Sequence, residues 1–183
     1  MQPMPYFQGN ITIRPNLELF NWKTALFSDS KNNTAKLSKS LHYESAKHAL
    51  LDILLRNKFS NNDLVTIITS SQNQYVSSCV TSTIEKICHW NRELTDRTKA
   101  IIVINEFGYI VDLKNLRNKF NGLIIEDNAY CFPLITDKTR QAYKNYSIYS
   151  FPKFFGGESG GLCIDEAEIS TSQRKQLKEI LKG

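Results

Sequence analysis

One lysine, Lys153, lies in a stretch whose composition could support chemistry at its amine. Pro152 precedes it and restricts the backbone, while Phe154 and Phe155 follow it and would shield the amine from water. Burial of this kind lowers the pKa of a lysine, so that its neutral amine can act as a nucleophile toward carbonyl groups or as a proton carrier. The simpler interpretation is a solvated surface charge, which is the usual setting of a lysine.

Two further features give the first interpretation more weight. Four glycines follow Lys153 closely: Gly156, Gly157, Gly160 and Gly161. Because glycine has no Cβ atom, the backbone at these positions can come close to a ligand or to another segment. Asp127 ends the apolar run that begins at Leu123. A carboxylate at the end of a buried strand can hold a positive charge on the ring nitrogen of a ligand, or it can cap a helix or turn.

The elements that must position these residues are predicted from hydrophobic patterns. Short β-branched and apolar runs predict strands over 64–68, 100–104, 122–127, 146–151 and 160–165. Apolar residues at three- and four-residue spacing predict helices over 42–57, 75–88 and 112–120, and the charged end of the chain a helix over 166–182. The polar segment 69–75 is expected to be a turn that can cap a helix.

Strands that alternate with helices predict a three-layer α/β/α fold with a mostly parallel sheet. We expect one such domain over 42–183, preceded by an irregular arm over 1–41. Ligands of these sheets bind outside the carboxyl ends of the strands. Asn105, Asp127 and the loop that carries Lys153 all fall at such ends, so we expect them to converge.

Composition excludes several other classes of protein. The formal net charge is +5, but 23 basic residues are interleaved with 18 acidic ones, so no basic stripe indicates nucleic-acid binding. The four cysteines form no Cys-x-x-Cys pair and do not cluster with histidines, so no metal site is predicted. No apolar run has the length of a membrane span or a signal peptide. We expect a cytoplasmic protein with reduced cysteines.

Several of these motifs together resemble a known family. In order and spacing, the chain resembles the core of the DegT/DnrJ/StrS-type aminotransferases in Asn105-Glu-Phe-Gly108, Leu123-Ile-Ile-Glu-Asp-Asn-Ala129, Ser150-Phe-Pro-Lys153 and Gly160-Gly161. The resemblance runs from about His42 to Asp165. Members of that family are pyridoxal-phosphate (PLP) enzymes of aspartate-aminotransferase fold type I, and they commonly act on keto-sugar nucleotides. The resemblance therefore implies the large domain of such an enzyme.

The resemblance also implies roles for individual residues. Lys153 would form the Schiff base with PLP and later move the proton, and Asp127 would pair with the pyridinium nitrogen. Ser150 and the helix start at Ala46-Lys47 would contact the phosphate, since a helix N-terminus suits an anion. Tyr75 is the candidate for the aromatic ring that stacks on the cofactor.

The chain departs from the family pattern at several places. Tyr130 stands where the family usually has Gln, so the ring face of the cofactor would be covered differently. Two residues separate Ser150 from Lys153, where the family usually has four. The connector 89–99 is expected to be too short for the additional strand that the family has there. The C-terminal small domain, which helps to bind substrate, is expected to be absent.

The leading hypothesis is an aminotransferase-like protein that moves an amino group from a glutamate-like amino acid to a keto-sugar nucleotide. It would work as a homodimer or as the partner of a longer relative, with no nucleic acid or membrane as partner. One alternative is a catalytically inactive pseudoenzyme that acts as a binding or scaffold partner. Another is an unrelated nucleotide-binding α/β protein, which the lack of a Gly-rich phosphate loop after the first predicted strand disfavours.

Overall fold

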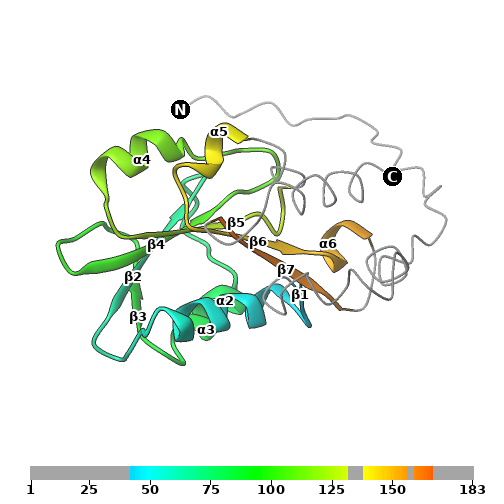
Figure 1. Ribbon diagram of the computed structural model, residues 1–183, viewed down its shortest axis with the longest axis horizontal. Coiled ribbons are helices and arrows are strands. Elements are labelled where there is room, and N and C mark those ends of the chain that lie inside the picture. The colour runs from blue at the N-terminus through cyan, green and yellow to red at the C-terminus, as the bar shows by residue number, and fades with distance from the viewer. Residues whose placement is uncertain (1–41, 132–137, 156–158, 167–183) are drawn as a thin grey trace.

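The computed structural model describes residues 42–131, 138–155 and 159–166, which form a seven-stranded sheet with helices packed against it (Figure 1). In chain order the elements are β1 (His42–Tyr43), α2 (Ala46–Arg56), β2 (Leu64–Thr69), α3 (Ser78–Ile84), β3 (His89–Asn91), β4 (Thr98–Ile104), α4 (Leu113–Lys119), β5 (Leu123–Asp127), α5 (Lys138–Gln141), β6 (Tyr146–Ser150), α6 (Pro152–Phe155) and β7 (Gly161–Asp165).

The sheet has the strand order β1-β7-β6-β5-β4-β2-β3. Strands β3, β2, β4, β5 and β6 run parallel to one another, while β7 runs antiparallel to both β6 and β1. The prediction of a mostly parallel sheet is therefore confirmed. Because β2, β4, β5 and β6 share one direction, their carboxyl ends lie at one edge of the sheet.

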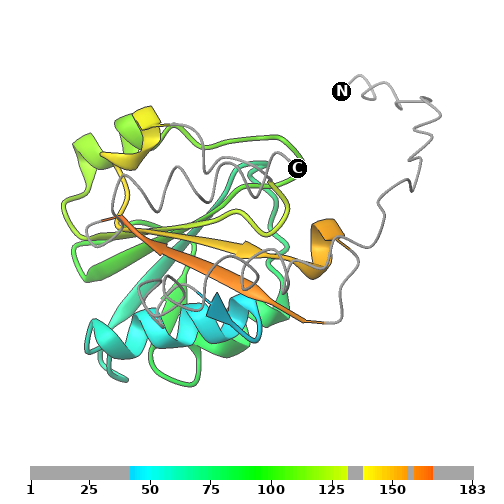
Figure 2. The same cartoon turned by 45° about the vertical axis from the view of Figure 1, so that its right-hand side comes forward.

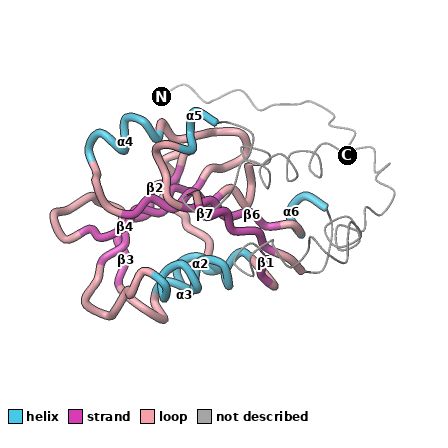
Figure 3. Tube along the Cα trace, viewed as in Figure 1, coloured by secondary structure: helices cyan, strands magenta, loops and turns pink. Residues whose placement is uncertain are grey.

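Helices cover both faces of the sheet, as predicted. α2 and α3 lie together on one face and α4 and α5 on the other, which Figure 2 shows from a second direction. The strands form one twisted layer between them (Figure 3). Alternate residues of β4 separate the two cores: Ala100 and Ile102 belong to the cluster under α2 and α3, whereas Ile101 and Val103 pack with Leu113 of α4.

The structure corrects two predicted helices. The helix expected over 42–57 begins at Ala46, because His42 and Tyr43 instead pair with Leu162 and Gly161 as an edge strand. The helix expected over 75–88 covers only Ser78–Ile84. Its N-cap is Ser77, whose hydroxyl accepts a hydrogen bond from the backbone of Cys79 at 3.3 Å. The N-cap Ser77 thus begins the helix three residues later than the apolar spacing indicated, and the helix ends earlier, at Ile84.

The connector 89–99 was expected to hold no strand, and this prediction was wrong. His89–Asn91 forms β3, which pairs in parallel with β2 at the edge of the sheet. Three residues are enough because an edge strand needs hydrogen bonds on one side only. The short helices α5 and α6 were not predicted either. The arm at 1–41 lies outside the described residues, as does the helix predicted over 166–182 from residue 167 onward.

Candidate active site

A cavity of about 450 Å³ opens at the carboxyl edge of the sheet. Segments from six parts of the chain form its wall: the start of α2, the turn after β2, the start of α3, and the ends of β4, β5 and β6 with α6. All seven residues for which the sequence predicted a role in the site line this one cavity; they are Ala46, Lys47, Tyr75, Asp127, Tyr130, Ser150 and Lys153. Asn105, which was expected to converge with them, does not line the cavity, because its amide donates a hydrogen bond to Glu126 at 2.8 Å. The structure thus brings together residues that are up to 107 positions apart in the chain.

Strand alternation explains why Asp127 and Ser150 meet on one face. Ile125 in β5 and Ile148 in β6 belong to the core beneath α2 and α3. Successive side chains of a strand point to opposite faces, so residues two positions further on return to the same face. Asp127 and Ser150 are those residues, and both lie at strand ends beside the cavity.

The start of α2 reaches the cavity because Gly161 lets it lie directly against β7. A Cβ atom on Gly161 would lie 2.4 Å from the carbonyl carbon of Ser45 and 2.5 Å from the nitrogen of Ala46. The backbone of Gly160 also donates a hydrogen bond to the carbonyl of Glu44 at 2.7 Å. The sequence predicted a close backbone approach at these glycines, and the approaching segment is the first turn of α2.

The carboxylate of Asp127 is buried without a charged partner. It accepts a hydrogen bond from the backbone N–H of Ala129 at 2.9 Å, and among the described residues no cation forms an ion pair with it. Burial raises the pKa of Asp127 to about 6, against a smaller lowering effect of the Ala129 hydrogen bond. A cationic ligand atom placed in the cavity next to this group would relieve the cost of burying its charge.

Glu126, the preceding residue, faces the other side of the sheet and is fully buried in an ion-pair network. Its carboxylate pairs with Arg140 at 2.5 Å and with Lys144, and accepts a hydrogen bond from Asn105 at 2.8 Å. Burial alone would raise the pKa of Glu126, but the charges of Lys144 and Arg140 outweigh it and hold that pKa below the ordinary value. The two adjacent acids therefore have opposite electrostatic settings.

Lys153 does not have the setting predicted for it. Phe154 and Phe155 were expected to desolvate its amine and lower its pKa, but the side chain is exposed on α6. Its amine lies 4.9 Å from the centre of the Tyr130 ring. Contact with the Tyr130 hydroxyl raises the pKa of Lys153, and the opposing effect of burial is smaller. The prediction was wrong because α6 turns the amine toward Tyr130 and the cavity instead of toward an apolar core.

Tyr75 lies at the cavity on the turn between β2 and α3, and its side chain is exposed. Two long-range contacts hold this turn. The carboxylate of Glu106 accepts a hydrogen bond from the Ser71 hydroxyl. On the other side, the guanidinium of Arg92 donates to the Thr69 hydroxyl at 2.9 Å and to the carbonyl of Asn73 at 2.8 Å.

Sequence reasoning did not single out Glu106 or Arg92. Glu106 follows a buried strand, as Asp127 does, so its position at a strand end was a signal that could have found it. Arg92 lies in a charged connector where nothing in the local pattern distinguishes it from Arg97. Its role follows only from the position of β3 beside β2.

The cavity has the chemical groups that suit PLP. Asp127 offers a buried carboxylate for a protonated ring nitrogen, and the start of α2 with Lys47 offers backbone N–H groups and a positive charge for a phosphate. Tyr75 and Tyr130 offer aromatic faces, and Lys153 offers an amine. The volume is also within the range of about 300–1,000 Å³ that is usual for small-molecule sites.

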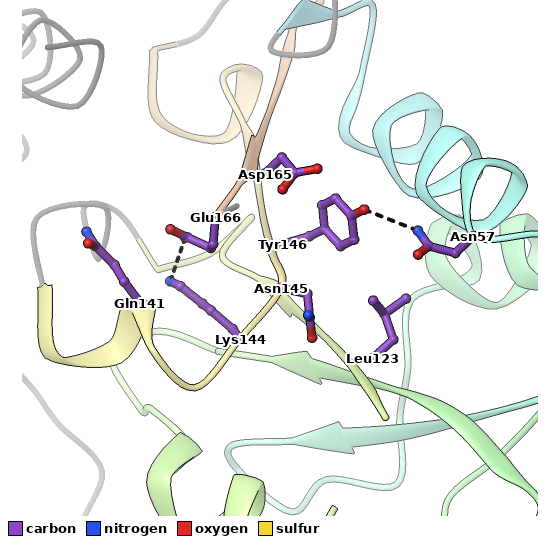
Figure 4. A pocket seen from close by; sticks show the side chains of 8 residues that line it. All are labelled: Asn57, Leu123, Gln141, Lys144, Asn145, Tyr146, Asp165 and Glu166. Atoms are coloured by element: carbon purple, nitrogen blue, oxygen red, sulfur yellow. Dashed lines mark hydrogen bonds and ion pairs between the residues drawn. The ribbon is translucent and has the colours of Figure 1, made fainter. Parts of the chain in front are cut away.

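A second cavity, of about 360 Å³, lies at the opposite edge of the sheet, at the amino ends of β5 and β6. Figure 4 shows its lining, with Lys144 paired to Glu166 and the hydroxyl of Tyr146 bonded to Asn57. It contains none of the residues predicted from the sequence. The candidate site is therefore the cavity at the carboxyl edge.

Neither a cluster of metal ligands nor a membrane-spanning helix is found in the part of the chain that the structure describes. Within residues 42–131, 138–155 and 159–166, no three His, Cys, Asp or Glu side chains gather as metal ligands would. In the same part of the chain, no helix has the length and apolar character needed to cross a membrane.

Comparisons with solved structures show the fold. "Putative sugar aminotransferase Spr1654" from Streptococcus pneumoniae, in its apo form, matches with a TM-score of 0.54 and 17% identity, over 76% of this chain and 44% of that one. NtdA from Bacillus subtilis with bound cofactor PMP gives a TM-score of 0.55 at 16% identity, over 74% of this chain and 34% of that one. The cysteine desulfurase CsdA from Escherichia coli gives 0.51 at 11% identity, over 87% and 48%.

The chain therefore spans less than half the length of these proteins, and identities this low establish a shared fold only. A sequence comparison with curated proteins gave no match. A family model described as "Putative PLP-dependent aminotransferase" matches residues 31–181, which is most of the chain and includes every residue of the candidate site. The chain belongs to this family of PLP-dependent aminotransferases.

Proposed function

We propose that this protein binds PLP in the cavity at the carboxyl edge and uses it to transfer an amino group. The observation that carries the proposal is the convergence of Lys153, Asp127, Ser150 and the start of α2 on one cavity. When bound, PLP supplies an electron sink for the carbon that loses its proton. The protein must supply binding, orientation and proton transfer.

Each role is proposed for a residue with a matching setting. Lys153 would hold the cofactor covalently, its neutral amine condensing with the PLP aldehyde as water leaves, and would move a proton at its Nζ atom, for which its place beside the cavity is suited. Asp127 holds the ring nitrogen protonated, since its buried carboxylate is relieved by a cationic partner. Ser150, Ala46 and Lys47 bind the phosphate.

Aromatic rings cover the ring of the cofactor in this proposal. Tyr75 and Tyr130 are the candidates, because both line the cavity and both are exposed in it. Tyr130 takes this role at the position where the resembling family usually has Gln. The turn that carries Tyr75 is tied to Glu106 and Arg92, so we propose that these two residues fix where that ring lies.

The substrate and the subfamily are the finer part of the proposal. We propose membership of the DegT/DnrJ/StrS-type group, with a glutamate-like amino acid as donor and a keto-sugar nucleotide as acceptor. Two structural neighbours support this choice: Spr1654, described as a putative sugar aminotransferase, and the aminotransferase TlmJ from Streptoalloteichus hindustanus.

The proposal also covers how the chain associates with other chains. Three large side chains next to the cavity, Phe107, Tyr109 and Ile110, are 76%, 67% and 49% exposed. Neighbouring exposed apolar side chains of this kind mark interaction sites. We propose that they contact a second copy of the chain or a longer relative.

A cytoplasmic location is proposed as well, since Cys79, Cys88, Cys131 and Cys163 are all free thiols.

Absorption spectroscopy tests the binding proposal. PLP added to the purified protein should produce an absorption band at a longer wavelength than that of free PLP, and borohydride should bleach this band. Peptide mass spectrometry should then place the added mass on Lys153. Lys153→Ala should abolish the added mass, while Lys114→Ala on α4, remote from the cavity, should not change it. A protein that takes up no PLP contradicts the proposal.

A second experiment separates an enzyme from a pseudoenzyme, which is the alternative class of function. Glutamate is added to the PLP-loaded protein, and 2-oxoglutarate is measured together with loss of the PLP band. Stoichiometric 2-oxoglutarate supports amino transfer. Cofactor that stays unchanged in the presence of glutamate and other amino donors supports a binding or scaffold role.

A further inference from the structure

We propose that Tyr130 is a positioning residue that holds the Lys153 amine as an ammonium group against the cavity wall and controls its release, with Phe107 supporting the Tyr130 ring. This inference rests on the proposed function, in which Lys153 attaches the cofactor. It goes further because it assigns to Tyr130 an effect on the lysine itself, separate from any contact with the cofactor ring.

The contact between the two side chains is the first observation. The Nζ atom of Lys153 lies 4.9 Å from the centre of the Tyr130 ring, within the range in which an aromatic face attracts a cation. Interaction with the Tyr130 hydroxyl is also the largest cause of the raised pKa of Lys153. The ring and the hydroxyl therefore both favour the charged form of the amine.

The support of the Tyr130 ring is the second observation. The rings of Phe107 and Tyr130 lie 5.2 Å apart at an interplanar angle of 40°. Phe107 has a φ of 48°, in the left-handed region that bulky residues rarely adopt, and Gly108 follows with a φ of 89°. A residue keeps such a conformation only where the surrounding structure holds it there. In this conformation the Phe107 ring lies against the Tyr130 ring.

Other titratable and charged groups border the same cavity and must be considered. Cys79 on α3 also raises the pKa of Lys153, with a smaller effect than Tyr130. Asp127 at the end of β5, Glu106 after β4 and Lys47 on α2 line the cavity as well, but none of them is a cause of the Lys153 shift. Tyr130 is thus the group whose removal should change Lys153 most.

The chemical consequence concerns the reactivity of the amine. An ammonium group has no electron pair with which to attack a carbonyl, so Lys153 must lose its proton before it can attach a cofactor. A contact that favours the ammonium form reduces the reactive fraction at neutral pH. Tyr130 therefore sets the pH range in which Lys153 becomes a nucleophile.

Competitive labelling of the cofactor-free protein measures this directly. The protein is treated with acetic anhydride from neutral to alkaline pH, and acetylation of each lysine is quantified by peptide mass spectrometry. Lys114, exposed on α4, serves as the internal reference. Tyr130→Phe, which removes the hydroxyl and keeps the ring, should shift the Lys153 profile to lower pH. Tyr130→Leu, which removes both, should shift it further.

Two controls make the assignment specific. Cys79→Ser should shift the Lys153 profile less than Tyr130→Phe does, and Phe107→Ala should shift it in the same direction as Tyr130→Phe by freeing the Tyr130 ring. Continued protection of Lys144, which is buried and paired with Glu126, shows that each variant is folded. Tyr130→Phe carries the test if Tyr130→Leu does not fold. The proposal is overturned if the Tyr130→Phe profile superimposes on that of the unsubstituted protein.

The labelling needs no PLP, so its outcome is independent of the cofactor experiment. A shift in Tyr130→Phe together with no uptake of PLP would retain the Tyr130 contact and reject the proposed function. PLP uptake on Lys153 without any shift in the Tyr130 variants would retain the proposed function and reject the role of Tyr130.

Discussion

Gly161 lies so close to Ser45 that a Cβ atom on the glycine would be 2.4 Å from the serine carbonyl carbon. The contact joins the start of β7 to the residue before α2, and both segments border the cavity or lie next to residues that do. Because backbone stands on both sides of the contact, no side chain can move aside. The position of the proposed phosphate site therefore depends on a residue that touches no ligand.

Gly161→Ala should displace the start of α2. Overpacking of this kind typically costs about 1–3 kcal/mol, and a displaced helix start should also weaken PLP binding. Urea denaturation measures the first effect and an absorption titration with PLP the second. An unfolding midpoint and a PLP affinity that both match the unsubstituted protein would contradict the proposed packing.

Asp127→Asn should make the cofactor-free protein more stable at neutral pH. The folded-state pKa of Asp127 is raised to about 6 from 3.8, so the folded state binds more protons than the unfolded state between these values. Stability of the unsubstituted protein therefore falls as pH rises through this range, by up to about 3 kcal/mol. Asparagine avoids this cost and keeps an oxygen for the Ala129 N–H.

The measurement for Asp127 is the difference in unfolding free energy between the two proteins at a series of pH values. It should be small near pH 4, grow toward pH 6 and then stay constant. PLP binding should be weakened in the same variant, because a neutral amide cannot hold the ring nitrogen protonated. A stability difference that does not change with pH would contradict a raised pKa for the buried Asp127 carboxyl.

Glu126→Gln should have the opposite effect on stability. It leaves Arg140 and Lys144 partly or fully buried without their shared carboxylate, a loss of about 3–5 kcal/mol when one partner of a buried pair is removed. Because the folded-state pKa of Glu126 is lowered, this stabilisation is present above the ordinary value of 4.5 and is lost as pH falls below it.

A matched acid-to-amide control for Glu126 is Asp63→Asn. Asp63 pairs with Lys99 at 3.0 Å near the surface, where water screens the charges, so its loss should be much smaller. Thermal or urea unfolding of both variants at neutral pH gives the comparison. Equal losses in the two variants would show that the Glu126 network does not behave as a buried ion pair.

Glu106→Ala should loosen the turn that carries Tyr75. The contact with Ser71 is near the surface, so we expect a loss of about 1 kcal/mol, which is about a fivefold weaker PLP affinity. Ser71→Ala should give a similar loss. If the two residues act through one contact, the double variant should be no weaker than either single one, which a double-mutant cycle measures. Additive losses would place Glu106 in a separate role.

The sequence alone predicted the layers of the fold and seven of the residues that line the cavity, whose roles stay predictions. Runs such as Leu64–Ile68 and Leu123–Asp127 are short and rich in β-branched residues, which predicted strands with Asp127 at a carboxyl end. The face to which Asp127 points was not predicted. Ser150 and Lys153 were found from their motif. These inferences rest on local patterns, which a single segment carries by itself.

The tertiary structure decided what surrounds each of these residues. Lys153 is exposed and lies against Tyr130, contrary to the desolvated setting that its neighbours in sequence indicated. Among the described residues Glu126 has ion-pair partners while Asp127 has none, although both belong to the same strand, because the face toward α5 presents Arg140 and Lys144. The sequence determined which groups would meet at the edge of the sheet. Their charge states depend on contacts between residues far apart in the chain, which only packing sets.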